Sequence, residues 1–282
     1  MIAGAFAPAH ITGFFSVIPN TDPLKAGSLG CGLCLEAGVR AKIDTHSAVP
    51  AITFNGEHTD FPTVEYVLNE LLGTDRPPFS LDLTSDVRPG FGFGVSGAAA
   101  LAAGFACAQV YDARTGERKI AAVAHCAEVL NRTGMGDVAG QCTGGLVMRT
   151  APGAPGVGVT RQISVKPCEI SWVCLGEIST ASILGEEETM KRVNEMGVKA
   201  LKSLRERPGL EHFMSLSRQF AVETGLISSR ALDAVEAVES QGGMASMAML
   251  GDTVFAPGKG EALQEFGNVG HSRFGFIGAR TL

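Results

Sequence analysis

Charged residues are scarce in this 282-residue chain, where they make up 18% of the sequence, against about a quarter in typical globular proteins. Lys and Arg number 23 and Asp and Glu 29, which gives a formal net charge of −6. An acidic chain with few cations has no general electrostatic attraction for nucleic acids or for anionic membranes. This composition excludes a non-specific polyanion-binding protein, and we expect neither a nucleic acid nor a membrane as a partner.

The sequence also lacks a recognisable targeting or membrane-spanning segment. The N-terminal MIAGAFAPAH has no basic region ahead of an apolar run, so we expect no signal peptide. The uncharged stretch 91–111 is long enough to span a bilayer, but it is built from Gly and Ala rather than from Leu and Ile. That composition favours a loop leading into a buried helix. We therefore expect a cytoplasmic protein.

Cysteine patterns typical of disulfide scaffolds or zinc sites are missing as well. The seven cysteines are odd in number and the chain is not small, so reduced thiols are expected. Cys31 and Cys34 form one CxxC pair, but a zinc site needs two further ligands at comparable spacing. Cys168 and Cys174 are too far apart to supply them. The cysteines are therefore interpreted as small buried hydrophobic residues.

Helical and extended segments are mixed along the chain without a regular βαβ alternation, which favours an α+β fold. Apolar spacing predicts helices over 63–72, 185–207, 210–224 and 229–239. The 185–207 helix is expected to bury a stripe formed by Met190, Val193, Val198, Leu201 and Leu204. Strands are predicted over 171–178, 252–257 and 273–282. The turn-rich and then extended segment 151–167 ends at the most natural domain boundary, which divides the chain into 1–167 and 168–282.

What the sequence has in excess is glycine, with 36 residues, and three of them alternate at 90, 92 and 94 in PGFGFGVSGAAA. Glycine permits positive φ and close backbone approach, and Ser96 and Gly97 then open an Ala-rich helix. Free N–H groups at such a helix start form a cradle for phosphate, and the alternative is a glycine turn packed between elements. A Walker A loop is excluded because no lysine is present. A Rossmann fingerprint is disfavoured because 81–89 reads as a poor central strand.

A second segment, EVLNRTGMGDVAGQCTGG over 128–145, places an acidic residue among small ones. Asp137 follows Gly-Met-Gly, and a buried carboxylate there needs a partner. Glu128 lies on an expected helix with His125 one turn before it. The alternative is a capping Asp, a solvent-facing Glu and a structural His. A third glycine loop, 242–252, carries three methionines, which more often fill a core than bind a ligand.

Together these three segments resemble, in order and in residues, the GHMP kinases. Within them, APAHITGFF (7–15), the GSLGCG turn (27–32) and the closing GARTL resemble the archaeal pantoate kinase subfamily. The resemblance implies a two-domain fold with a ribosomal protein S5 domain 2-like N-terminal domain and a ferredoxin-like C-terminal domain. The chain departs from the usual family motifs at Phe93 and Val95, at Ala-Pro-Ala-His in the first motif, and at Met-Ala-Ser-Met in the third.

The resemblance implies phosphoryl transfer from ATP to the C4 hydroxyl of D-pantoate, which makes 4-phosphopantoate for coenzyme A biosynthesis. Asp137 is then the base that accepts the hydroxyl proton, and Ser96 and Glu128 hold Mg²⁺. Ser28 and His125 match positions that contact pantoate. The residues expected to bind the nucleotide are Pro89, Gly90, Gly92, Gly94, Val95, Ser96, Gly97 and Ala98.

Pantoate carries a carboxylate, so a cation near the acceptor is required. Arg149 ends the apolar LVM strand twelve residues after Asp137, and its guanidinium can hold a carboxylate in bidentate fashion. Arg132 is its competitor. Three alternatives stay open: another small-alcohol kinase of this fold acting on homoserine or mevalonate, a non-catalytic nucleotide or metabolite sensor, and a nicotinamide oxidoreductase. Related enzymes are often homodimers, although no surface pattern here identifies an interface.

Overall fold

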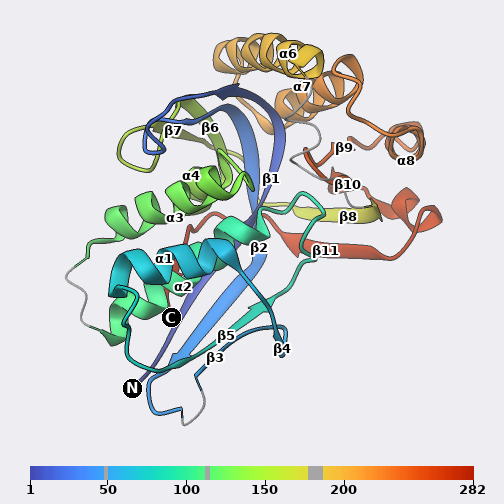
Figure 1. The fold of residues 1–282 in the computed structure, drawn as a ribbon. Coiled ribbons are helices and arrows are strands. Elements are labelled where there is room, and N and C mark those ends of the chain that lie inside the picture. Colours follow the sequence, from blue (N-terminus) through green and yellow to red (C-terminus); the bar gives the residue numbers. More distant parts are fainter. Residues whose placement is uncertain (48–49, 112–114, 177–186) are drawn as a thin grey trace.

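The computed structural model describes residues 1–282 except 48–49, 112–114 and 177–186. Two β-sheets with helices packed on them form an α+β architecture, as the sequence predicted (Figure 1). In the described part of the chain the first sheet has eight strands in the order β12-β1-β2-β5-β3-β4, with β6 paired to β2 and β7 to β6. Its strands are β1 (Ile2–Ile18), β2 (Gly27–Asp44), β3 (Ala51–Phe54), β4 (Glu57–His58), β5 (Ser80–Ser85), β6 (Leu146–Ala151), β7 (Val159–Ile163) and β12 (Arg280–Thr281).

A long antiparallel hairpin of β1 and β2 runs through the molecule and organises the first sheet (Figure 1). The prediction of a turn at 27–32 was wrong, because these residues lie inside β2 and pair with β1 and β6. The glycines there serve close approach instead: side chains at Gly30 and Gly32 would collide with the Phe14 carbonyl and with the His10 ring. Glycine at these positions therefore leaves room for the Phe14 carbonyl and for the His10 ring.

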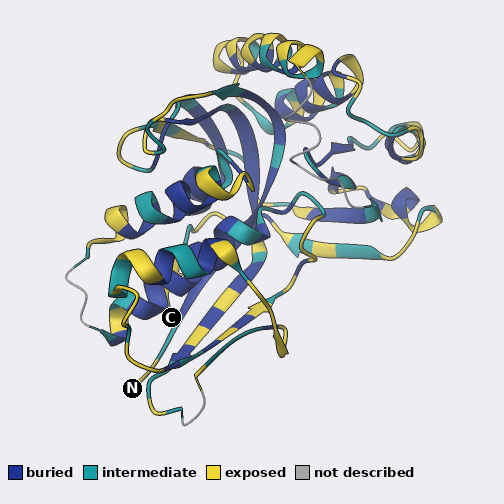
Figure 2. Cartoon of the chain, viewed as in Figure 1, coloured by how far each residue is buried: buried dark blue, intermediate teal, exposed yellow. Residues whose placement is uncertain are grey.

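The strand β5 lies between β2 and β3, inside the sheet, although its sequence reads as a poor central strand. Leu81 and Leu83 are buried, while Asp82 and Thr84 face solvent on the other side of the sheet. A sheet with one solvated face tolerates such alternation at interior positions. Figure 2 shows the same alternation along the lower half of β2. The sheet lacks the doubly wound parallel order that a Rossmann fold requires.

Among the helices of the first half, α2 (Val95–Val110) and α4 (Asp137–Thr143) contact the first sheet, while α1 (Pro62–Leu72) and α3 (Glu117–Asn131) pack on α2 (Figure 1). The α1 prediction is confirmed, with Gly73 as the C-cap at φ +81°. The expected Ala-rich helix is α2, which is buried on nearly all sides and contacts both β1 and β2. Among the described residues no helix combines the length and apolarity needed to cross a bilayer.

The second half of the described chain forms a sheet in the order β11-β8-β10-β9 and supplies the remaining helices, two of which also contact β1 of the first sheet. Its elements are β8 (Glu169–Gly176), α6 (Glu187–Glu206), α7 (Leu210–Glu223), α8 (Ser229–Ser240), β9 (Ser246–Met247), β10 (Asp252–Pro257), the 3₁₀ helix η1 (Glu261–Glu265) and β11 (Val269–Arg273). The three predicted helices and the 252–257 strand are confirmed, and the β8 prediction holds to residue 176, with 177–178 outside the described residues.

Two predictions in this half were wrong. Val198 is exposed rather than part of the buried stripe of α6, because Gly197 faces inward and allows the helix backbone to contact β1 at Phe15. The closing segment 273–282 is not one strand. Arg273 ends β11, which pairs with β8, β12 pairs with β1, and Phe274 makes a single bridge to Leu35. Its neighbouring glycines Gly275 and Gly278 pack against the backbone at Leu35 and Cys142 instead of continuing a strand.

Aromatic side chains connect the two halves through one hydrophobic core. Phe14 of β1, Phe213 of α7 and Phe255 of β10 form a row, with ring centroids 6.1 and 6.5 Å apart. The predicted boundary at 167/168 falls between β7 and β8, where the chain passes from the first sheet to the second. The division into domains 1–167 and 168–282 stays a prediction, since the core is shared and β12 returns to the first sheet.

Candidate active site

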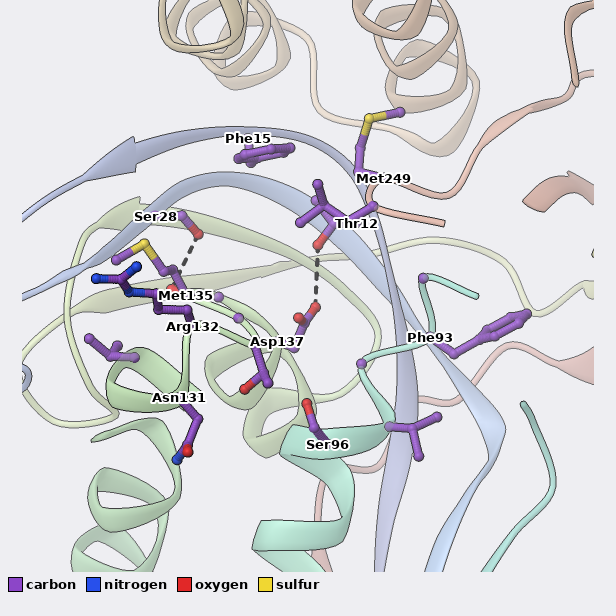
Figure 3. Close-up of a pocket in the computed structure, with 18 of the residues that line it drawn as sticks. Thr12, Phe15, Ser28, Phe93, Ser96, Asn131, Arg132, Met135, Asp137 and Met249 are labelled. Atoms are coloured by element: carbon purple, nitrogen blue, oxygen red, sulfur yellow. Dashed lines mark hydrogen bonds between the residues drawn. The ribbon is translucent and has the colours of Figure 1, made fainter. Parts of the chain in front are cut away.

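A cavity of about 470 Å³ lies where the glycine-rich loops of the two halves meet β1. Its walls come from β1, from the loop before α2, from the α3–α4 connection and from the loop between β9 and β10. Figure 3 shows Thr12, Ser96 and Asp137 around this cavity with Phe15 and Met249 above them. The segments singled out in the sequence thus converge on one place.

The 90–94 loop has the conformation expected of a phosphate cradle. Gly90, Gly92 and Gly94 have φ values of +83°, +82° and +61°, and Gly94 is the N-cap of α2. Of the eight residues predicted to bind nucleotide, six line the cavity: Pro89, Gly90, Gly92, Gly94, Val95 and Ser96. Gly97 and Ala98 do not line the cavity. Gly97 leaves room for the Gln141 side chain, whose amide nitrogen donates a hydrogen bond of 2.7 Å to the Gly94 carbonyl.

Asp137 is the first residue of α4, and only one of its carboxylate oxygens is engaged. Oδ1 lies 2.7 Å from Nδ1 of His10 and 3.5 Å from the Thr12 hydroxyl. Oδ2 has no hydrogen bond from the described residues. Burial raises the pKa of Asp137, but His10, Arg149 and Thr12 outweigh it, so the pKa lies below its usual value. The carboxylate is therefore ionised and one oxygen is free to accept a proton.

Glu128 lies on α3 and is 2% exposed. Its Oε1 accepts a hydrogen bond of 2.7 Å from Thr133, whereas Oε2 is buried without a hydrogen-bond partner among the described residues. Burial raises the pKa of Glu128 to about 7, against the lowering effect of the hydroxyls of Ser96 and Thr133. An orphaned buried carboxylate oxygen beside a serine hydroxyl suits a hard divalent cation, because Mg²⁺ takes oxygen ligands and needs few of them from the protein.

Arg149 on β6 is also 2% exposed, and its Nε and Nη1 have no hydrogen-bond partner in the described part of the chain. A side chain at Gly136 would come within 2.6 Å of Nε, and one at Gly30 within 3.1 Å of Nη2, so these two glycines leave room for the guanidinium. Burial lowers the pKa of Arg149, while Asp137 raises it. A buried guanidinium with free donors is costly unless an anion joins it.

The other predicted acceptor residues occupy different positions. Ser28 lines the cavity beside Arg149 and donates to the Met135 carbonyl over 3.3 Å. The His125 ring does not line it: its Nε2 lies 2.9 Å from the Ala26 carbonyl, two residues before Ser28. The predicted contact of His125 with the acceptor stays untested. Arg132 lines the cavity but is exposed, in the left-handed region at φ +56°.

His10 and Thr12 were not predicted as site residues, although both contact Asp137. The signal available was the APAHITGFF motif itself, in which a histidine and a threonine stand two residues apart. In an extended strand, residues two apart face the same side. The two side chains can therefore reach the same partner, but only the long-range pairing of the fold identifies that partner as Asp137.

A phosphate cradle, an ionised carboxylate and a buried orphan glutamate around one cavity define a phosphotransferase site. The family model described as "GHMP kinases N terminal domain" matches residues 61–145, which include the cradle, Glu128 and Asp137. A homoserine kinase from Cytophaga hutchinsonii has the same fold, with a TM-score of 0.68 at 16% identity over 100% of this chain and 97% of that one. The chain belongs to the GHMP kinase family.

Within that family the similarity is to pantoate kinases. The chain is 33% identical over 261 residues to "Pantoate kinase" of Methanocaldococcus jannaschii, covering 92% of this chain and 94% of that protein. It is 37% identical over 270 residues to "Pantoate kinase" of Thermococcus kodakarensis, covering 91% and 87%. A solved structure titled "Phosphotransferase related to CoA biosynthesis pathway" matches with a TM-score of 0.89 and 30% identity, over 100% of this chain and 99% of that one.

Proposed function

We propose that this protein transfers the γ-phosphoryl group of ATP to the C4 hydroxyl of D-pantoate, which yields ADP and 4-phosphopantoate for coenzyme A biosynthesis. Full-length similarity to two pantoate kinases supports the proposal. The observation that carries it is the presence, in one cavity, of an ionised Asp137 and of a buried Arg149 whose Nε and Nη1 have no hydrogen-bond partner among the described residues. An alcohol that also bears a carboxylate satisfies both groups.

The glycine loop is the proposed site for the nucleotide phosphates. Positive φ at its three glycines gives the loop its tight turns beside the cavity, and the N-terminus of α2 adds its positive dipole end. Ser96 and Glu128 are the residues that would hold Mg²⁺, whose charge neutralises the phosphates when it is bound. Among the described residues no cluster of three or more His, Cys, Asp or Glu side chains could hold a metal by itself, so the nucleotide has to complete this site.

Asp137 supplies the base. Its free Oδ2 accepts the proton of the C4 hydroxyl as that oxygen forms a bond to the γ-phosphorus and the bond to the ADP oxygen breaks. The low pKa of Asp137 makes it a weak base, which suits a loose transition state in which the proton leaves late. Its main contribution is then to orient the hydroxyl in line with the phosphoryl group.

Arg149 is the proposed partner of the pantoate carboxylate. Ser28 and Arg149 line the main cavity and also a second cavity of about 120 Å³. Phe15, Val17 and Met249 add apolar surface that suits the two methyl groups of pantoate. Asp137 is the only carboxylate among the described residues lining the main cavity. The ammonium of homoserine would therefore lack a partner there and face cationic neighbours.

A coupled ADP-release assay tests the proposal, with ATP and Mg²⁺ over D-pantoate, homoserine, mevalonate and glycerate. Turnover with pantoate alone is expected, and Asp137→Asn should remove it while ATP binding persists. Turnover with another alcohol instead would keep the kinase chemistry but refute the acceptor. No ADP release with any of the four alcohols, while ATP still binds, would contradict the kinase activity and favour a nucleotide sensor.

A further inference from the structure

The side chain of His10 is fully buried at the centre of β1 and connects three parts of the site. Its Nδ1 lies 2.7 Å from Oδ1 of Asp137, and its backbone N–H donates to the carbonyl of Phe93 in the glycine loop over 2.9 Å. Two residues further on, the Thr12 carbonyl accepts a hydrogen bond of 2.9 Å from the backbone N–H of Met249. One short stretch of strand thus touches the base, the phosphate loop and the loop from the C-terminal half.

The fold gives this stretch a special geometry. The pairing of β1 with β2 shifts register between Pro8 and His10 and again between Thr12 and Phe14. Such bulges bend a strand and redirect its side chains, and they are common next to active sites. Here the two shifts flank the segment from His10 to Thr12, whose first and last side chains both contact Asp137.

Two glycines leave room for the His10 ring. A side chain at Gly32 of β2 or at Gly140 of α4 would come within 2.5 Å of its Nε2. Neither glycine has positive φ, so glycine is required for space: for the ring at Gly140, and for the ring and the Ile11 carbonyl at Gly32. Gly140 lies in the middle of a helix, where glycine costs about 1 kcal/mol relative to alanine. The helix therefore contains a destabilising glycine at the position that faces the His10 ring.

The ring has one tautomer that fits its surroundings. Asp137 is ionised and can only accept, so Nδ1 carries the proton and donates it. Nε2 is buried against the two glycines without a hydrogen-bond partner in the described part of the chain, which leaves no acceptor for a second proton. Burial lowers the pKa of His10, against the raising effect of Asp137. His10 is therefore a neutral donor.

We propose that His10 is a positioning residue: it holds Oδ1 of Asp137 through Nδ1–H and thereby presents Oδ2 to the acceptor hydroxyl. This inference rests on the proposed function, because it gives the base its orientation. The donor takes one lone pair of the carboxylate and prevents rotation about the Cβ–Cγ bond. His10 touches neither the phosphates nor the acceptor, since it does not line the cavity.

The test compares His10→Ala and His10→Asn with the unmodified protein in the ADP-release assay. The amide Nδ2 of asparagine can occupy the place of the histidine Nδ1 and donate to Asp137, whereas alanine has no donor. We expect His10→Ala to lower kcat by about 10- to 100-fold, the effect of a misplaced catalytic group. The KM for ATP should stay within twofold, and His10→Asn should recover most of kcat.

A double-mutant cycle separates positioning from a general packing effect. In an Asp137→Ala background, the residual rate of ADP release measured at high enzyme concentration should not fall further with His10→Ala, because the only target of the histidine is gone. Additive losses, equal impairment by His10→Ala and His10→Asn, or a folded His10→Ala with unchanged kcat would each overturn the inference. If His10→Ala does not fold, His10→Asn decides: full loss of kcat with normal ATP binding counts against positioning. An unmodified protein without pantoate turnover would instead refute the proposed function.

Discussion

At the scale of single residues, the site is defined by two buried charged groups that the protein itself leaves incomplete. Within the described part of the chain, one carboxylate oxygen of Glu128 and two guanidinium nitrogens of Arg149 have no hydrogen-bond partner. Unpaired buried polar groups are rare in folded proteins, because each costs about 1–3 kcal/mol and charged ones cost more. Both groups lie at the cavity or directly behind its wall, where a metal–nucleotide and an acidic acceptor can complete them.

Replacement of Arg149 by alanine tests its role as the carboxylate partner. The KM for pantoate should rise about 10- to 100-fold, because charge-assisted hydrogen bonds worth about 1.5–3 kcal/mol are lost from the bound substrate. The kcat and the KM for ATP should change little. Steady-state kinetics of Arg149→Ala and of the matched Arg132→Ala variant distinguish the two arginines. A rise in the KM for pantoate only in Arg132→Ala would transfer the role to the exposed arginine.

Local sequence identified Ser96, Glu128, Asp137 and Arg149 because each stands in or beside a motif with a chemical meaning. It missed His10 and Thr12, whose contacts with Asp137 span 127 and 125 residues of chain. The contact of His125 with the acceptor stays a prediction, and its ring lies within hydrogen-bond distance of the Ala26 carbonyl. Motif spacing shows which groups are available, but the pairing of distant strands decides which of them face each other.

At the scale of elements, glycine loops from opposite halves pack backbone to backbone. Gly92 and Gly251 are in contact, and a side chain at Gly251 would collide with the backbone of Phe91 and Gly92. The adjacent Leu250 is held at φ +65° and lines the cavity. The loop between β9 and β10 therefore supports the phosphate cradle from behind.

The variant Gly251→Ala should displace the cradle without touching the base. We expect kcat/KM for ATP to fall about 10- to 100-fold, since a shift near 1 Å in a positioned group has that effect. Gly116→Ala is the matched control, because no described residue lies within 4 Å of a side chain at Gly116. Kinetics with varied ATP check this, and equal values for the two variants would contradict a supporting role for the loop.

The buried His125 ring anchors the loop between β1 and β2 through the Ala26 carbonyl. Burial lowers the pKa of its ring below 6.5, against the raising effect of the carbonyls of Ala26 and Pro23. The unfolded chain then binds the proton more tightly than the folded one. The free energy of unfolding should be highest above about pH 6.5 and should fall as the pH decreases toward the folded-state pKa.

Denaturant unfolding at several pH values between 7.5 and 5 tests this dependence. The variant His125→Gln should reduce the acid slope by up to about 1.4 kcal/mol per pH unit, the contribution of one titrating group. His58→Gln, at an exposed position, should leave the slope as it is. Identical slopes for all three proteins would exclude His125 as a source of acid sensitivity.

Secondary structure was predicted well where periodicity is local and poorly where pairing is distant. The helices α1, α6, α7 and α8 and the strand β10 follow from apolar spacing and turn residues. The two longest strands were not predicted. Residues 5–10 of β1 are all buried and show no alternation, and the glycines of β2 resemble a turn. Their strand character comes from burial between helices on one side and the second half of the chain on the other.

At the scale of the whole molecule, the two sheets share one core and place the cavity between their loops. The single tryptophan, Trp172 of β8, packs edge-to-face on Phe93 of the glycine loop, with ring centroids 5.4 Å apart. The second half of the chain therefore contacts the phosphate cradle through a ring whose fluorescence can be followed.

A shared core predicts one cooperative unfolding transition. The fluorescence of Trp172 and the far-ultraviolet circular dichroism of the helices should give the same midpoint in denaturant. Two separated midpoints would show that 1–167 and 168–282 unfold independently, and would contradict the joint core of Phe14, Phe213 and Phe255.

The most direct test of the central proposal is the ³¹P NMR spectrum of the product formed from ATP, Mg²⁺ and D-pantoate. Phosphorylation at C4 predicts one new phosphomonoester signal, split by the two protons of the C4 methylene group, with ADP formed in equal amount. A signal split by a single proton would place the phosphate on the C2 hydroxyl, and the absence of any new ester would contradict a pantoate kinase.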